Sequence, residues 1–115
     1  TCAPALRVLG ERFVVNNGAA GMANFVGETA GLLTRISARP LPPALERLRA
    51  YGLHERGVWI DALRIPFDAD AWLARFDALW PGGSPAARSY RERIARGPAF
   101  SVDQALGRAP AACAV

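Results

Sequence analysis

The chain has 115 residues, 51% of them hydrophobic, so it is long enough for one domain with a real core and is not expected to be disordered. Its net charge of +4 comes from fourteen arginines and no lysine. Most of these arginines alternate with acidic residues, which indicates a solvated surface and not the clustered basic stripe that nucleic acids require. No apolar run approaches the roughly 20 residues of a membrane-spanning helix. We therefore expect no nucleic-acid partner, no membrane partner and a cytoplasmic location.

The first third of the chain predicts a β-hairpin, a loop and a further strand. ALRVL and RFVVN, residues 5–9 and 12–16, have strand-like alternation and are joined by Gly10 and Glu11. Asn16, Asn17 and Gly18 tolerate sharp turns and end the second strand. The loop GAAGMANFVGETAG follows, and GLLTRIS, residues 31–37, has the composition of a buried strand. Because long loops are often functional, this loop is the first place to look for a site.

The middle of the chain predicts a helix and then a strand. Pro43 suits the first position of a helix ALERLRAYGL, which Gly52 should end. VWIDALRIPF, residues 58–67, alternates as a strand does until Pro66 terminates it.

Two helices and a tail are expected after residue 67. Asp68 or Asp70 can cap the helix AWLARFDALW, and Ser84 opens PAARSYRERIARG, which Gly97 closes. The tail, residues 99–115, is expected to be poorly ordered, with at most a helical turn near residues 103–106. The large aromatic residues could form a stacking surface for bases or sugars, but their spacing favours core packing: Trp59, Phe67, Trp72, Phe76, Trp80 and Tyr90.

The order of these elements predicts a mixed α and β fold of about four strands and three helices, α+β as it stands. The strands should form one small sheet, largely antiparallel or mixed, covered by helices. The expected organisation is one domain over residues 1–98, followed by the tail.

Several kinds of site are excluded by residue type. A P-loop needs a lysine, and a dinucleotide fingerprint needs a helix after its glycines. The single histidine, His54, is at no motif spacing from a cysteine or serine and is expected to be a solvent-exposed loop residue. Cys2 and Cys113 are expected to be free thiols. Three aspartates can be interpreted as cation ligands or, more commonly, as helix caps and turn formers: Asp61, Asp68 and Asp70.

The first 37 residues, TCAPALRVLGERFVVNNGAAGMANFVGETAGLLTRIS, resemble the C-terminal end of the calcineurin-like metallophosphoesterases. Those enzymes carry a late Gly-His-Thr-His or Gly-His-Thr-Cys motif, followed after a short strand pair by a turn of the Asn-Pro-Gly-Ser type. Thr1 and Cys2 correspond to the end of the first motif, and Asn-Asn-Gly-Ala at residues 16–19 corresponds to the turn. The later sequence, to about Pro98, is more loosely similar to the C-terminal extension of a bacterial branch.

The resemblance implies the C-terminal part of an αββα sandwich, in an enzyme that hydrolyses phosphomonoesters or phosphodiesters with two divalent metal ions, Mn, Fe or Zn. One position carries over as a metal ligand, Cys2, in place of the motif's final histidine. The family's remaining ligand motifs are not in these 115 residues, so no catalytic or cofactor-binding residue is assigned. The chain alone is expected to be inactive without its partner, the missing N-terminal half of the same domain. The alternative interpretation is a small, non-catalytic protein-interaction module.

Overall fold

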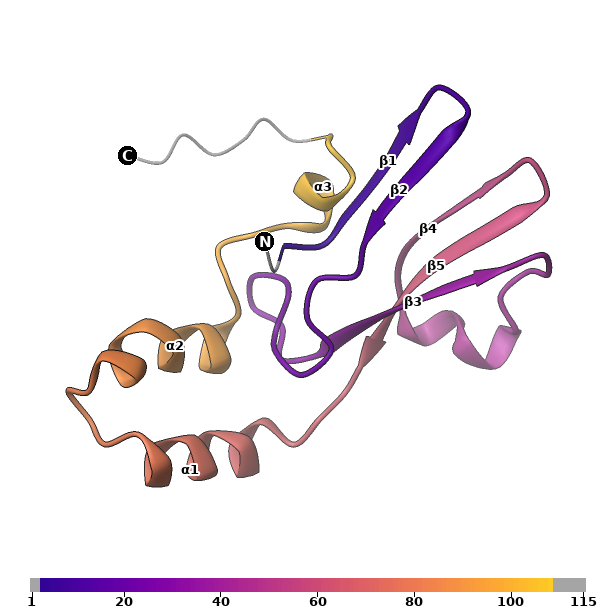
Figure 1. Ribbon diagram of the computed structural model, residues 1–115. Coiled ribbons are helices and arrows are strands. Elements are labelled where there is room, and N and C mark those ends of the chain that lie inside the picture. The colour runs from indigo at the N-terminus through magenta and orange to yellow at the C-terminus, as the bar shows by residue number, and fades with distance from the viewer. Residues whose placement is uncertain (1–2, 109–115) are drawn as a thin grey trace.

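The computed structural model describes residues 3–108, which fold into two antiparallel sheets, a 3₁₀-helix and three α-helices (Figure 1). The fold is therefore a mixture of α and β elements, as predicted, but the described residues contain five strands in two sheets where four strands in one sheet were expected. One sheet pairs β1 (Ala5–Leu9) with β2 (Arg12–Asn16), and the other has the order β3-β5-β4, with β3 at Gly31–Ser37, β4 at Arg49–Glu55 and β5 at Val58–Ile65.

The β1–β2 hairpin forms as the sequence predicts. Leu6 pairs with Val15, and Leu9 pairs with Arg12 across the two-residue connection. Gly10 in that connection has a φ of 60°, a conformation that glycine adopts without the penalty of a Cβ atom. The strands β3 and β5 also form at their predicted positions.

The core lies between the two sheets and is closed by the loop that links β2 to β3. Phe25 of this loop stands edge-on to Tyr51, at 6.3 Å between ring centroids, and stacks on Phe100 at the same separation. Burial of the Tyr51 phenol raises its pKa, against the opposing influence of the Arg7 charge. The buried residues of this cluster come from both sheets, from the loop and from the C-terminal helix: Leu6, Phe25, Leu32, Tyr51, Ile60, Ala62 and Ala105.

The prediction of a helix over residues 44–53 is wrong from residue 49 onward. A 3₁₀-helix, η1, spans Pro43–Leu48, and β4 follows it without a break. Tyr51 and Leu53 have the period-two spacing of a strand, and pairing with β5 buries Tyr51. Gly52, the predicted helix end, lies within β4, where a Cβ atom would stand 3.0 Å from the Asp61 carboxylate. Pairing with β5 therefore overrides local helix propensity.

The two long helices form where they were predicted, with the first beginning two residues earlier, at Ala69 and not at Ala71, but they do not cover a sheet. α1 spans Ala69–Leu79 with Asp68 as its N-cap, and α2 spans Pro85–Arg96 between its caps Ser84 and Gly97. They lie side by side and project away from both sheets (Figure 1). Asp77 of α1 accepts two hydrogen bonds from Arg91 of α2, at 2.8 and 2.9 Å, and these bonds lower the pKa of Asp77.

The aromatic residues on and just after α1 are therefore only partly buried. Phe76 is 8% exposed, whereas Trp72 and Trp80 are 38% and 49% exposed. The prediction of core packing is correct for Phe76 and wrong for Trp72 and Trp80, because α2 covers only the middle of these α1 aromatic residues. It is also wrong for Tyr90 of α2, which is 50% exposed.

Residues 99–108 pack against the rest of the fold, and the helical turn expected near residues 103–106 forms among them. α3, at Val102–Ala105, begins with a capping box between Ser101 and Gln104. Arg7 of β1 donates hydrogen bonds to the carbonyl oxygens of Gln104 and Ala105, and Ala105 is fully buried. The rest of the predicted tail, residues 109–115, lies outside the described residues. No helix within residues 3–108 is long and apolar enough to cross a membrane.

Candidate functional site

The loop between β2 and β3 is built around asparagine side chains. The Asn17 side chain donates to the Leu32 carbonyl oxygen at 2.8 Å and accepts from the Thr34 hydroxyl at 2.9 Å, so it joins the end of β2 to β3. The Gly18 amide donates to the Asn16 side chain at 3.0 Å, and Gly18 has a φ of 73°. The predicted turn at the strand end therefore forms through the side chains that suggested it.

Asn24 holds the centre of the loop. It is 2% exposed, its side-chain oxygen accepts from the Ala19 amide at 2.8 Å, and its side-chain nitrogen donates to the carbonyl oxygens of Ala19 and Met22 at 2.6 and 3.0 Å. These bonds satisfy the side chain within the loop, so Asn24 positions the backbone.

The second half of the loop is fixed to β5 by an ion pair. Glu28 accepts two hydrogen bonds of 2.8 Å from Arg64, one from Nε and one from Nη2. The hydrogen bonds from Arg64 to Glu28 are the main reason why the pKa of Arg64 is raised. Arg64 also donates to the Arg49 carbonyl oxygen of β4 at 3.0 Å, so the pair connects the loop to two strands.

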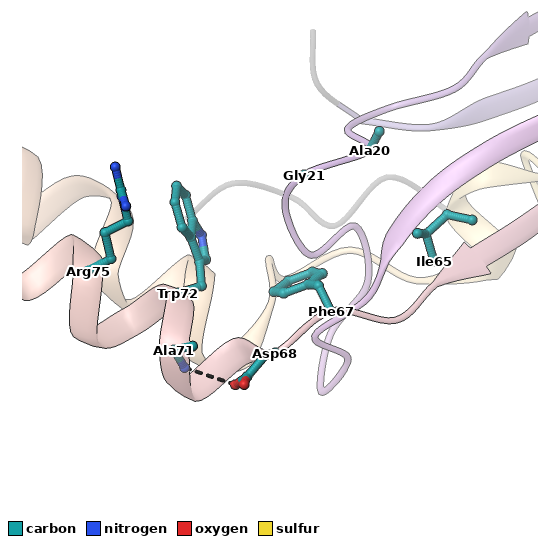
Figure 2. A pocket seen from close by; sticks show the side chains of 8 residues that line it. All are labelled: Ala20, Gly21, Ile65, Phe67, Asp68, Ala71, Trp72 and Arg75. Carbon is teal, nitrogen blue, oxygen red and sulfur yellow. Dashed lines mark hydrogen bonds between the residues drawn. The ribbon is translucent and has the colours of Figure 1, made fainter.

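Two cavities lie beside this loop, and Phe67 lines both. The first, of about 480 Å³, lies between the loop at Ala20 and Gly21 and the first turns of α1 (Figure 2). The second, of about 460 Å³, has more polar walls because Glu28, Thr29 and Arg64 contribute to it. The loop predicted to be functional therefore borders two open cavities, although none of its asparagines lines either one.

The predicted metal-ligating residues do not come together. Cys2 lies outside the described residues. Asp68 is engaged as the N-cap of α1, and Asp61 is buried on β5 at 1% exposure. Within residues 3–108 no group of three or more histidine, cysteine, aspartate or glutamate side chains could hold a metal ion.

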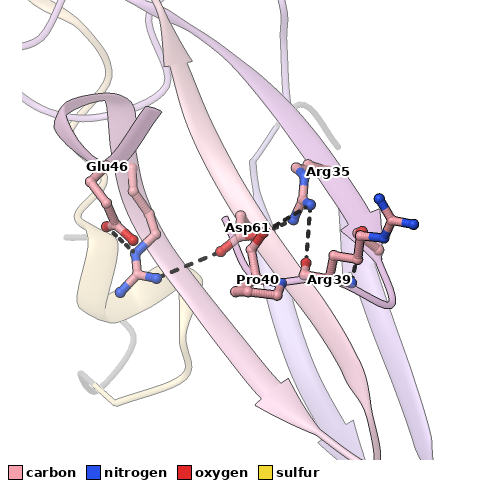
Figure 3. A network of polar contacts seen from close by, with 7 residues as sticks. Arg35, Arg39, Pro40, Glu46 and Asp61 are labelled. Atoms are coloured by element: carbon pink, nitrogen blue, oxygen red, sulfur yellow. Dashed lines mark hydrogen bonds and ion pairs between the residues drawn. The ribbon is translucent and has the colours of Figure 1, made fainter. Parts of the chain in front are cut away.

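Asp61 instead joins a network of arginines on the outer face of the β3-β5-β4 sheet (Figure 3). Its carboxylate is 3.0 Å from Arg35 and 3.6 Å from Arg49, and Arg49 is 3.6 Å from Glu46. Arg35 also donates to the carbonyl oxygens of Arg39 and Pro40. Two guanidinium groups face two carboxylates, so the network is balanced in charge and fixes the β3–η1 connection to the sheet.

His54 is exposed, as predicted, but it belongs to β4 and not to a loop. Its imidazole stacks on the Trp59 ring of β5, at 3.9 Å between centroids and 11° between planes. The aromatic stack explains why a histidine occupies this strand position. No cysteine within residues 3–108 and no serine within hydrogen-bond distance accompanies it.

Sequence reasoning missed Arg75, which lines the first cavity next to Trp72. The sequence contained a signal for this residue: Arg75 has no acidic residue three or four positions away on its helix, so it cannot form an ion pair within the helix. The buried role of Asn24 was also missed, and its local sequence offers no comparable signal. No protein-family model matches this chain, and neither a curated protein nor a solved structure is significantly similar to it.

Proposed function

We propose that this chain is the C-terminal part of a calcineurin-like metallophosphoesterase, which hydrolyses phosphate esters only together with the N-terminal half of the same domain. The observation that carries the proposal is a set of large apolar side chains left exposed on the strands of both sheets.

The exposed apolar side chains lie on strands whose edges are unpaired among the described residues. Leu33 and Ile36 of β3 are 49% and 65% exposed. On the other sheet the residues are Val8, Leu9 and Val14. Edge strands of this kind are normally paired or covered in a finished domain. The position of these residues supports the proposal that strands from another segment extend both sheets. The αββα sandwich of the metallophosphoesterases would require such strands.

The proposal assigns the two divalent metal ions to ligands outside the described residues. Residues 3–108 do not fit a metal centre, because no three of their histidine, cysteine, aspartate or glutamate side chains lie close enough together to hold a metal ion. In the proposal, the β2–β3 loop borders the two-metal site, and Cys2 is the candidate metal ligand of this chain.

The test compares the 115-residue chain with the product of the same reading frame extended upstream of Thr1. Both are assayed with p-nitrophenyl phosphate and bis(p-nitrophenyl) phosphate in the presence of Mn²⁺. We expect Gly-His to precede Thr1, and we expect the extended protein to hydrolyse at least one ester in a reaction that EDTA stops. An upstream sequence without Gly-His, or equal turnover by the 115-residue chain, would contradict the proposal.

A second candidate function, a protein-interaction module, is favoured by one observation. The helix pair that projects from the sheets exposes Trp72, Leu79, Trp80 and Tyr90 by 38% to 62%. Exposed aromatic residues are common anchors of interfaces. A sharp, reversible melting transition of a monomeric 115-residue chain would favour this function over the first.

A further inference from the structure

The cavity between α1 and the β2–β3 loop has the size and lining of a small-molecule site. Its volume of about 480 Å³ lies within the range of roughly 300–1,000 Å³ that is usual for ligand pockets. Most of its wall is apolar and comes from three places in the sequence: the loop at Ala20 and Gly21, the end of β5 at Ile65 with Phe67 just after it, and α1 at Ala71 and Trp72.

Two charged residues border this cavity, and only one is free to bind a ligand. Asp68 accepts a hydrogen bond from the Ala71 amide at 2.9 Å, so its carboxylate serves as the helix cap. For the Arg75 guanidinium, no ion pair or hydrogen bond is found within residues 3–108. By contrast, Arg64 and Arg91 each bind a carboxylate through two hydrogen bonds.

Arg75 and Trp72 are placed to act together. They are three residues apart on α1, and their side chains extend in the same direction from the helix, with the Phe67 ring on the other side of Trp72 (Figure 2). Trp72, the largest side chain that lines the cavity, is 38% exposed. The arrangement offers two aromatic rings for stacking and one planar cation at the edge.

We propose that this cavity binds a flat aromatic ligand that carries one anionic group, with its ring against Phe67 and Trp72 and its anion at Arg75. Aromatic rings pack favourably in offset or edge-on geometry. A guanidinium group matches a carboxylate or phosphate through two parallel hydrogen bonds. The inference does not depend on the proposed function, because it is argued from cavity-lining residues within residues 3–108.

The test measures binding of three naphthalene probes to the ¹⁵N-labelled 115-residue chain by NMR: 2-naphthoate, 2-naphthalenemethanol and 2-naphthylmethylamine. We expect 2-naphthoate to shift the Trp72 indole and the amides of Gly21 and Ala71 in a saturable manner. The neutral alcohol should bind about tenfold more weakly, because it lacks the charge-assisted hydrogen bonds to Arg75. The ammonium probe should bind more weakly still.

Variants separate the two parts of the site. Arg75→Gln should weaken 2-naphthoate about tenfold and leave the neutral alcohol unchanged. Arg47→Gln removes the same charge from an exposed position in η1 and should change neither affinity. Ala71→Phe should fill the cavity and abolish binding of both probes, with its fold checked by circular dichroism.

Three results would overturn the inference. Equal affinities of the anionic and neutral probes would show that the cavity is only an apolar surface, suited to a protein segment or a second copy of the chain. Shifts centred on Leu79, Trp80 and Tyr90 would place binding elsewhere on the helix pair. Absence of saturable binding would exclude the site altogether.

Discussion

Asn24 sets the shape of the loop that borders both cavities. Its side chain makes three hydrogen bonds to backbone groups of Ala19 and Met22 while it is 2% exposed. A buried donor or acceptor that loses its partner costs about 1–3 kcal/mol. Asn24 therefore helps to fix the backbone at Ala19, together with the Leu32 amide, which donates to the Ala19 carbonyl oxygen at 3.0 Å, and the next residue, Ala20, is part of the cavity wall.

We predict that Asn24→Ala lowers the free energy of unfolding by about 2 kcal/mol, since the Ala19 amide and the Met22 carbonyl oxygen lose their partner, whereas the Ala19 carbonyl oxygen keeps the hydrogen bond from the Leu32 amide. Urea unfolding followed by tryptophan fluorescence measures this. Thr29→Ala is the control, because Thr29 is an exposed residue of the same loop and its effect should stay within about 0.5 kcal/mol. Equal effects of the two variants would show that Asn24 has no special role.

At the residue scale, the sequence predicts a side chain's role only where its partners are close along the chain. The turn at Asn16 to Gly18 and the caps Asp68 and Ser84 could be identified because a strand or helix end requires them within three residues. Asp61 pairs with Arg35 and Arg49 across two neighbouring strands, so its role depends on strand order, which the sequence did not provide. The same holds for Arg75, whose significance comes from a cavity shared by three segments.

At the scale of elements, α2 meets the β2–β3 loop through its C-terminal end. The Gly27 amide donates to the Arg96 carbonyl oxygen, and the Val26 amide donates to the Phe100 carbonyl oxygen, both at 2.9 Å. Gly97 turns the chain at this junction with a φ of 75°, and a Cβ atom there would overlap the Phe25 carbonyl oxygen. The sequence predicted Gly97 as a helix end, but not its close approach to the loop.

We predict that Gly97→Ala destabilises the protein by about 2–3 kcal/mol, because alanine is strained at positive φ and collides with backbone. Gly82→Ala is the matched control, since a Cβ at Gly82 meets nothing within 4 Å and its φ is not in the left-handed region. Thermal melting measures both. A Gly97→Ala protein as stable as the Gly82→Ala protein would mean that α2 does not dock on the loop in solution.

The strand β4 shows why local signals failed for one element. Residues 44–53 include leucine, glutamate, arginine and alanine, which favour a helix, and they follow a proline suited to a helix start. Pairing with β5 supplies backbone hydrogen bonds and buries Tyr51, which a lone helix on the surface would not do. The turn at Arg56 and Gly57, both with positive φ, closes this hairpin in the geometry that two-residue connections prefer.

At the scale of the whole molecule, the described residues do not pack into one compact body, because α1 and α2 pack mainly on each other (Figure 1). The helix pair and the two sheets share little common interior (Figure 1). This shape agrees with the proposal that another segment completes the sandwich.

The unpaired edge of β3 leads to a prediction about self-association. β3 is an outer strand, and its Ile36 is 65% exposed. Unpaired apolar edges promote strand pairing between molecules, and a charged residue on the edge suppresses it. We predict that the 115-residue chain associates as its concentration rises, and that Ile36→Lys lowers the association constant about tenfold or more. Sedimentation velocity over a range of concentrations measures both.

Val26→Lys is the control for this prediction. Val26 is 62% exposed but lies in the β2–β3 loop, so the substitution adds the same charge away from the strand edge. If added charge alone opposed association, both variants would weaken it equally, because repulsion depends on net charge. If the β3 edge is the contact, only Ile36→Lys should act. If the 115-residue chain stays monomeric at every concentration, the β3 edge is not an interface. That result would also weaken the proposed function.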